Sequence, residues 1–191
     1  MLEVELKAAL TPEQTAGLPV RLEAMGFADS ALLQETDLYW NGGGRDFRET
    51  DEALRLRRVA DLRTQKAENL LTYKGPRRDS RSNTRLEHET SVGSMETARQ
   101  LLEALGYQAA YIVEKRRREF TREGITVCLD QVAGLGNYLE LEILLRDGMD
   151  RDAAIDRLLA LLDSLGVSRE ALCRRSYLEL LIAADTVRKS S

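Results

Sequence analysis

The sequence contains little cysteine and histidine, the residues on which disulfide scaffolds and most zinc sites depend. Among 191 residues there are two cysteines, Cys128 and Cys173, and one histidine, His88. Two cysteines without metal-type spacing argue against a disulfide scaffold and a zinc site, and they fit a reducing compartment. A lone histidine without partners seldom carries chemistry, so His88 is interpreted as a packing or surface residue.

Long apolar runs and a large charge excess are also missing. No apolar stretch of about 18 residues is present, and charges begin at Glu3, so we expect no signal peptide, no membrane span and a soluble, cytoplasmic protein. The formal net charge of -4 argues against broad binding to nucleic acid or a membrane surface. Local basic clusters can still hold a small polyanion, so the predicted partner is a small molecule.

The pattern of apolar residues predicts a single domain over 1–191 that belongs to the α+β class. With 43% hydrophobic residues the chain can build a substantial core. Thr11, Ser94 and Asp150 are typical N-caps of helices. The predicted strands are 2–10, 33–40, 53–60, 69–75, 84–91, 111–121, 124–132 and 137–146. A short turn between the last two indicates a hairpin, so we expect an antiparallel eight-stranded β-barrel flanked by helices.

Charged residues alternate with apolar ones along these strands. In Glu3-Val4-Glu5-Leu6-Lys7, the three charged side chains share one face at a spacing of roughly 7 Å. Like charges this close repel unless opposite charges lie among them, which hints at a bound cation with an anion nearby. The same alternation recurs in most of the other strands.

If the sheet curls so that these faces point inward, acids and bases line one cavity. Buried charges cost several kcal/mol each when unpaired, so the two sets must compensate one another, remain hydrated or bind a ligand. A metal-bound polyphosphate answers both sets, because Arg and Lys bind phosphate oxygens while carboxylates hold Mg²⁺ or Mn²⁺. The alternation by itself leaves these three outcomes open.

An ordered set of motifs across roughly residues 1 to 182 resembles the CYTH superfamily, the triphosphate tunnel metalloenzymes. The motifs are EVELK (3–7), LRLRR (54–58), TYKGP (72–76), RLEHE (85–89), VEKRR (113–117), LDQVAGLGNYLELE (129–142) and RSYLELL (175–181). The resemblance implies an antiparallel tunnel that binds a triphosphate with a divalent metal, Mg²⁺ or Mn²⁺. Within the superfamily the motifs look most like class IV adenylyl cyclases, which convert ATP to cyclic AMP and pyrophosphate.

The resemblance and the alternation together assign roles to charged residues. The candidate metal ligands are Glu3, Glu5, Glu87, Glu89, Asp130, Glu140 and Glu142. The candidate triphosphate-binding residues are Lys7, Arg55, Arg57, Lys74, Arg85, Lys115 and Arg117. Glu5, Lys7 and Asp130 are the candidate catalytic residues. Tyr39 and Tyr177 are interpreted as packing residues. Asn41 is a departure, because relatives often carry an acid at this position.

Three functions remain open from the sequence. A cyclase acting on ATP is the first, and a hydrolase of inorganic triphosphate, thiamine triphosphate or nucleoside triphosphates is the second. The third is a non-catalytic polyphosphate-binding module, which has no use for interior carboxylates. The direction in which a triphosphate lies is not fixed by the sequence. The leucine-rich stripe of 155–165 and the SYLELLIAA segment are compatible with a homodimer.

Overall fold

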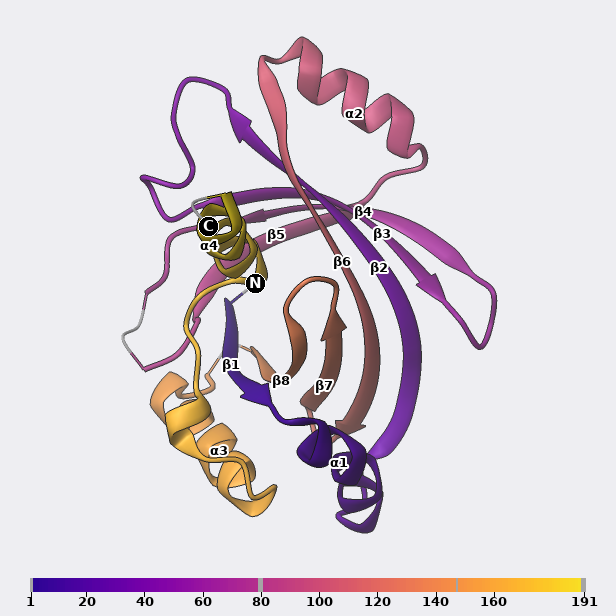
Figure 1. Cartoon of the computed structure of the whole chain (residues 1–191), viewed down its shortest axis with the longest axis vertical. Coiled ribbons are helices and arrows are strands. Elements are labelled where there is room, and N and C mark those ends of the chain that lie inside the picture. The colour runs from indigo at the N-terminus through magenta and orange to yellow at the C-terminus, as the bar shows by residue number, and fades with distance from the viewer. Residues whose placement is uncertain (1, 79–80, 147, 190–191) are drawn as a thin grey trace.

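The computed structural model describes residues 2–78, 81–146 and 148–189, and its strands form a closed antiparallel barrel (Figure 1). The strands are β1 (Leu2–Leu10), β2 (Ala28–Gly42), β3 (Ala53–Asp61), β4 (Ala67–Lys74), β5 (Arg85–Ser91), β6 (Tyr107–Arg122), β7 (Ile125–Val132) and β8 (Gly136–Leu145). Around the barrel they follow the order β1-β5-β4-β3-β2-β6-β7-β8. The predicted class and the eight-stranded antiparallel barrel are confirmed.

Strands β2 and β6 are longer than the sequence predicts. Alternation indicates 33–40 and 111–121, whereas the two strands pair from Ala28 opposite Thr121 to Gly42 opposite Tyr107. Backbone hydrogen bonds to a partner strand maintain the extended conformation whatever the side chains are. The ends of both strands can therefore be extended without the regular alternation of apolar and polar residues by which a strand is recognised in a sequence.

Four helices flank the barrel in the part of the chain that the structure describes, and the caps predicted for three of them are confirmed. Thr11, Ser94 and Asp150 each accept a hydrogen bond from a backbone N–H of the first helical turn. The helices are α1 (Pro12–Ala24), α2 (Met95–Ala104), α3 (Arg151–Ser164) and α4 (Tyr177–Lys189), with a short 3-10 turn at Arg169–Ala171. No helix in these described ranges combines the length and apolarity needed to cross a membrane.

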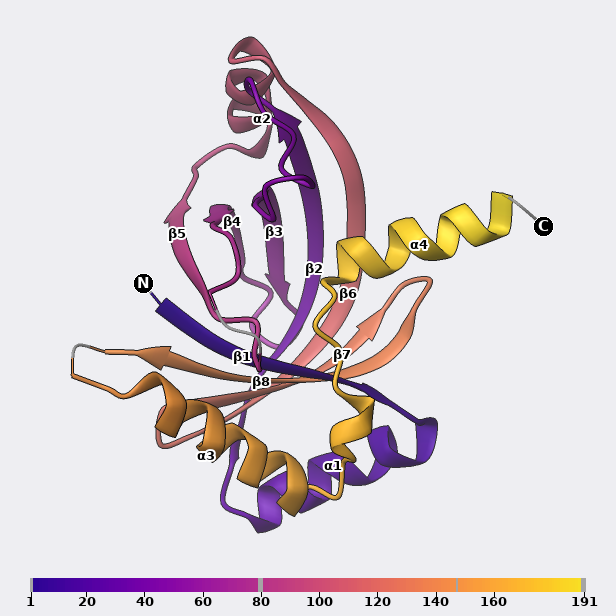
Figure 2. The ribbon, with the colours of Figure 1, turned by 90° about the vertical axis from the view of Figure 1, so that its left-hand side faces the viewer.

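The main hydrophobic core lies outside the barrel, between its strands and helices α1 and α3. Figure 2 shows both helices on the same side of the barrel. Val4 and Leu6 of β1 are buried there with Leu141 of β8 and with Ile155 and Leu158 of α3. Since side chains alternate along a strand, fixing this apolar set against the helices turns the charged set toward the barrel interior. The core thus decides where the charges go.

Two smaller cores complete the packing. Helix α2 places Ala98 and Leu102 against the outer face of the barrel, on the side away from α1 and α3 (Figure 1). Helix α4 lies at one end of the barrel, where Tyr177 and Leu181 pack with Tyr138 of β8. Apolar and aromatic side chains pack together at that end of the barrel.

The substitution Leu158→Ala should lower the free energy of unfolding by about 2–5 kcal/mol, because it leaves a cavity between α3 and the barrel. Leu158 is fully buried, whereas Leu101 of α2 is 60% exposed and provides a matched helical leucine. Leu101→Ala should change the free energy of unfolding by less than about 0.5 kcal/mol. Urea titration monitored by circular dichroism measures both values, and equal losses would contradict the placement of the core.

Candidate active site

Acidic and basic side chains from neighbouring strands face one another inside the barrel. The strand register sets Lys7 opposite Glu140, Glu5 opposite Glu142 and Arg117 opposite Asp130. Most predicted triphosphate-binding residues are buried, namely Lys7, Arg55, Arg57, Arg85, Lys115 and Arg117, while Lys74 is half-buried. The expectation that the charged faces converge on one interior is confirmed by the structure.

Arg117 is the centre of the largest charged group. Its guanidinium donates to the two carboxylate oxygens of Asp130 at 2.7 and 2.6 Å and also to Glu140. The ammonium of Lys7 lies 3.1 Å from Glu140 and 3.2 Å from Glu5. Burial acts to raise the pKa of Glu140, but Lys7 and Arg117 outweigh it and hold that pKa well below its usual range. Glu140 is therefore a charged partner of two cations.

A second charged group includes Glu35, a residue that the sequence analysis missed. Arg57 donates to Asp37 at 2.6 and 2.8 Å, and its guanidinium lies 2.9 Å from Glu35. Lys115 lies 3.1 Å from Glu35 and 3.5 Å from Asp130, joining the two groups. Against the effect of burial, Lys115 and Arg57 lower the pKa of Glu35 to about 2. The available signal was that Glu35, Asp37 and Tyr39 occupy alternate positions along β2 and so share a face.

A cluster of three carboxylates is the candidate metal centre. Oxygens of Glu3, Glu5 and Glu142 all lie within 4.8 Å of one another. Burial, together with the charges of Glu87 and Glu5, outweighs Lys74 and raises the pKa of Glu3 to about 7. Burial and the charge of Glu3 raise the pKa of Glu142 well above its usual range. Three crowded carboxylates with a shortage of positive charge suit a divalent cation with oxygen ligands, such as Mg²⁺ or Mn²⁺.

The other predicted metal ligands lie beside cations or hydroxyl groups. Glu87 accepts a hydrogen bond from Lys74, and Glu89 accepts one from the hydroxyl of Thr72 at 2.7 Å. Asp130 and Glu140 both accept hydrogen bonds from Arg117, as described above. Of the predicted ligands, the structure gathers only Glu3, Glu5 and Glu142 into a cluster within the described residues.

Two further predicted positions lie at the edge of this arrangement. Arg85 donates to the backbone carbonyls of Asp51 and Gly75 at 3.0 and 3.2 Å, and to the Asp51 carboxylate at 3.0 Å. Asn41, the departure from the family pattern, accepts from the Phe47 backbone N–H and donates to Asp46. Arg85 thus fixes the loop before β3, and Asn41 fixes the turn after β2.

Helix α4 supplies a polar contact at its end of the barrel. The buried hydroxyl of Tyr177 donates to Asp130 at 2.9 Å. The ammonium groups of Lys7 and Lys115 lie 4.5 and 5.4 Å from the centre of its ring. Tyr177 packs as predicted, but it also holds an interior carboxylate, a role that depends on where α4 docks.

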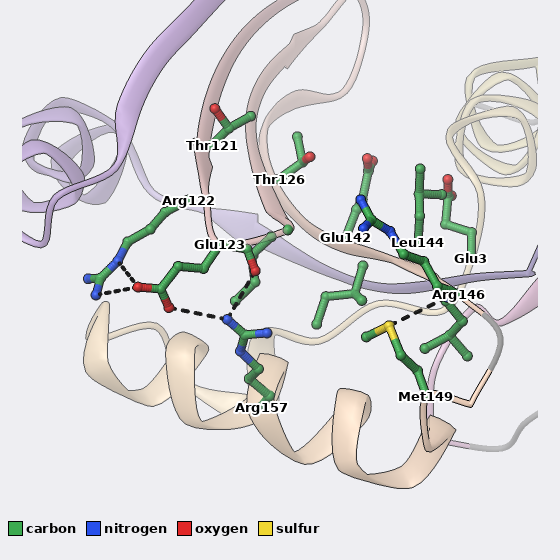
Figure 3. A pocket seen from close by; sticks show the side chains of 14 residues that line it. Glu3, Thr121, Arg122, Glu123, Thr126, Glu142, Leu144, Arg146, Met149 and Arg157 are labelled. Carbon is green, nitrogen blue, oxygen red and sulfur yellow. Dashed lines mark hydrogen bonds and ion pairs between the residues drawn. The ribbon is translucent and has the colours of Figure 1, made fainter.

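The opposite end of the barrel opens into a pocket of about 1000 Å³ that Glu3 and Glu142 help to line (Figure 3). The carboxylate cluster therefore lies next to the open end, and the paired cations lie between it and Tyr177. In chemical terms the interior offers a cluster of three carboxylates followed by a set of ammonium and guanidinium groups.

The family model described as CYTH domain matches residues 1–177. A protein of Methanocaldococcus jannaschii, named "Putative adenylate cyclase MJ0240", is 36% identical over 180 residues, which cover 94% of this chain and 98% of that protein.

Solved structures show the same fold. The PH1819 protein from Pyrococcus horikoshii OT3 is 35% identical, with a TM-score of 0.85 over 95% of this chain and 98% of that chain. A protein from Hippeastrum, named "Putative adenylyl cyclase HpAC1" and described as having a dominant triphosphatase activity, is 18% identical, with a TM-score of 0.62 over 87% of this chain and 88% of that chain. From the family match and the relative at 36% identity, this chain belongs to the CYTH domain family.

Proposed function

We propose that this protein is a divalent-metal-dependent enzyme that acts on a triphosphate, and that its reaction is the conversion of ATP to cyclic AMP and pyrophosphate. The observation that carries the proposal is the carboxylate cluster of Glu3, Glu5 and Glu142 beside buried cations in one barrel interior. The name of the relative at 36% identity supports the choice of cyclisation.

The cations are the groups proposed to grip the triphosphate. Lys7, Arg57, Lys115 and Arg117 are fully charged because nearby carboxylates raise the pKa of each one against the effect of burial. The same carboxylates fix the directions of these side chains before a ligand arrives, which reduces the reorganisation needed on binding. Arg55 of β3 and Lys74 of β4 add two more cations to this set.

Interior carboxylates outnumber these cations, which favours a metal-bound triphosphate over a free one. The acids on the inner face of the barrel include Glu3, Glu5, Glu35, Asp37, Glu87, Glu119, Asp130, Glu140 and Glu142, and Glu89 lies on the same face with a side chain that is 45% exposed. A free triphosphate would add several negative charges to this set. The family implies dependence on a divalent metal, and Glu3, Glu5 and Glu142 are the residues proposed to hold it. When bound, Mg²⁺ or Mn²⁺ would supply positive charge to the phosphate oxygens and acidify a nearby hydroxyl.

The chain's own residues have distinct proposed roles around that centre. Glu5 belongs to the proposed metal-binding cluster and also pairs with Lys7, so it links the metal site to the triphosphate-binding cations. Lys7 and Arg117 are placed to neutralise a departing pyrophosphate. Asp130 does not belong to the carboxylate cluster, and its proposed role is to hold Arg117 and Lys115 in position.

Hydrolysis of a triphosphate is the second candidate function. The same cations and carboxylates serve both reactions, and the Hippeastrum protein with the same fold is described as a dominant triphosphatase. The two reactions differ in which phosphorus the nucleophile attacks. Cyclisation takes place at the α-phosphorus, whereas hydrolysis to orthophosphate takes place at the terminal one.

Incubation with ATP and Mg²⁺ or Mn²⁺ should give cyclic AMP and pyrophosphate, identified by chromatography and ³¹P NMR. Orthophosphate with ADP, or orthophosphate from inorganic triphosphate, would instead establish the hydrolase. Glu5→Gln should reduce turnover about 100-fold or more, because it removes one carboxylate of the metal cluster and several kcal/mol of transition-state stabilisation. Glu114→Gln on the exposed outer face of β6 is the matched control and should retain full turnover. A non-catalytic binder would show no turnover and would bind its ligand as well or better after Glu5→Gln.

The affinity for Mn²⁺ should fall as the pH decreases from 8 to 6. The pKa of Glu3 is raised to about 7, so below that pH a proton must leave before the metal binds. Displacing one proton weakens binding about tenfold per pH unit below the pKa. Electron paramagnetic resonance of free Mn²⁺ measures this affinity. Glu3→Gln should bind Mn²⁺ more weakly and with a shallower pH dependence, and an unchanged slope would exclude Glu3 as a ligand.

A further inference from the structure

We infer that a hollow on the outer wall of the barrel, between α1 and strands β2, β6 and β7, binds a small organic phosphate. The phosphate group lies on Arg116 and Arg118, and the organic part lies on Leu32 and Leu129. The hollow is on the opposite face of the sheet from the charged interior, so the site is separate from the interior and independent of the proposed reaction.

The basic run of β6 supplies cations to both faces of the sheet. Lys115 and Arg117 are buried in the barrel interior, where they pair with carboxylates. Arg116 and Arg118 alternate with them along the strand, so their side chains leave the sheet on the outer face. The proposed reaction uses the inner pair and leaves the outer pair without a role.

Strand pairing sets the two outer arginines in neighbouring rows across the sheet. Arg118 lies opposite Leu32 of β2 on one side and opposite Leu129 of β7 on the other. Arg116, two residues earlier in β6, lies opposite Gln131 of β7. One row therefore joins a guanidinium to apolar surface, and the next row joins a guanidinium to an amide.

The hollow has the volume and the charge of a site for a small anion. It measures about 440 Å³, within the usual range of about 300–1,000 Å³ for small-molecule sites. Three arginines and two amides line it, namely Arg63, Arg116, Arg118, Gln131 and Asn137. Among the described residues of its wall, the one acid is Asp130, whose carboxylate is turned inward to Arg117. In a chain with more acids than bases, this is a local excess of positive charge.

Asp29 holds two of these arginines in place and leaves N–H groups of both free to donate. Arg63 donates to the backbone carbonyl and the carboxylate of Asp29 at 3.1 and 2.6 Å. Arg118 donates through Nε and Nη2 to the same carboxylate at 3.1 and 2.8 Å, and Nη2 also lies 3.3 Å from the exposed Glu23. Its guanidinium lies 4.8 Å from the ring centre of Phe120. In the ranges that the structure describes, Nη1 of Arg118 makes no hydrogen bond, so a preoriented donor is available to a ligand.

Arg116 is the second donor to the phosphate. Its side chain is exposed, and over residues 2–78, 81–146 and 148–189 its guanidinium makes no hydrogen bond and no ion pair. A guanidinium presents five N–H donors in a planar fork that matches the oxygens of a phosphate. The Cα atoms of Arg116 and Arg118 are roughly 7 Å apart on one face of the strand, a separation that two long side chains bridge through a single phosphate group.

The remaining wall of the hollow suits an organic group attached to that phosphate. Pro19 of α1, Leu32 and Leu129 give it apolar surface. Gln131 and Asn137 add donors and acceptors of the kind that bind the polar edge of a sugar or a heterocycle. An inorganic phosphate would leave the apolar part of the hollow empty. A nucleoside monophosphate has both parts and is the probe of choice.

Calorimetric titration with AMP, adenosine and inorganic phosphate tests the inference. Every titration contains EDTA, which removes the divalent metal that the interior site is proposed to need. AMP should bind, and adenosine and inorganic phosphate should each bind about tenfold more weakly or worse, because each fills only part of the hollow. Arg116→Gln should weaken AMP about tenfold by removing a charge-assisted hydrogen bond. Arg99→Gln changes an exposed arginine of α2, on the side of the barrel away from α1, and should leave the affinity unchanged.

The side-chain amide signals in ¹H–¹⁵N NMR spectra locate the bound AMP. AMP should shift the signals of Gln131 and Asn137 and leave that of Asn83, which donates to Glu5 of the carboxylate cluster at 3.0 Å, unchanged. A shift at Asn83 alone would place AMP in the barrel interior and overturn the inference. So would unaltered binding of AMP by Arg116→Gln, binding of adenosine or inorganic phosphate as tightly as AMP, or no binding of AMP. Since no metal is present, none of these outcomes bears on the proposed function.

Discussion

Mutual compensation of charge inside a closed barrel is the constraint on which this structure depends. A buried ion without a partner costs several kcal/mol, so acids and bases must meet at the correct register. The strand register places acids opposite bases, for example Lys7 opposite Glu140 and Arg57 opposite Asp37. Strands β6 and β7 do the same for Arg117 and Asp130. A slip of one residue would turn each strand's charges into the apolar cores outside the barrel. The charged side chains inside the barrel and the apolar side chains outside it, beneath the helices, therefore require the same strand register.

Compensation is complete at one end of the interior and incomplete at the other. Near α4, Arg117, Asp130 and Glu140 satisfy one another, and Tyr177 donates to the same group. Near the open end, Glu3 and Glu142 lack sufficient positive charge, which is why burial raises the pKa of both carboxyl groups. A divalent ion with an attached phosphate chain would correct this imbalance. The asymmetry gives the interior two chemically different ends and underlies the proposed reaction.

The sequence predicted those parts of the site that depend on alternation along one strand. Glu3, Glu5 and Lys7 share a face because the strand has a period of two residues, and Val4 and Leu6 fix that face against the core. The sequence did not indicate Glu35, because the run around it carries less regular alternation than β1. Nor did it separate Glu140 from Glu142. Both lie on the same face of β8, yet Glu140 lies opposite Lys7 whereas Glu142 lies opposite Glu5.

The amino-acid sequence by itself determined the class of fold, the helix caps and the inward face of each strand, since these follow from local periodicity and from side chains a few residues apart. Only the tertiary structure decided which carboxylates gather into one cluster, because cross-strand partners such as Glu5 and Glu142 are far apart in the chain. It also decided which end of the barrel is open, since α4 must fold back over the interior before Tyr177 meets Asp130. Alternation orients a side chain, but only closure of the barrel gives it neighbours.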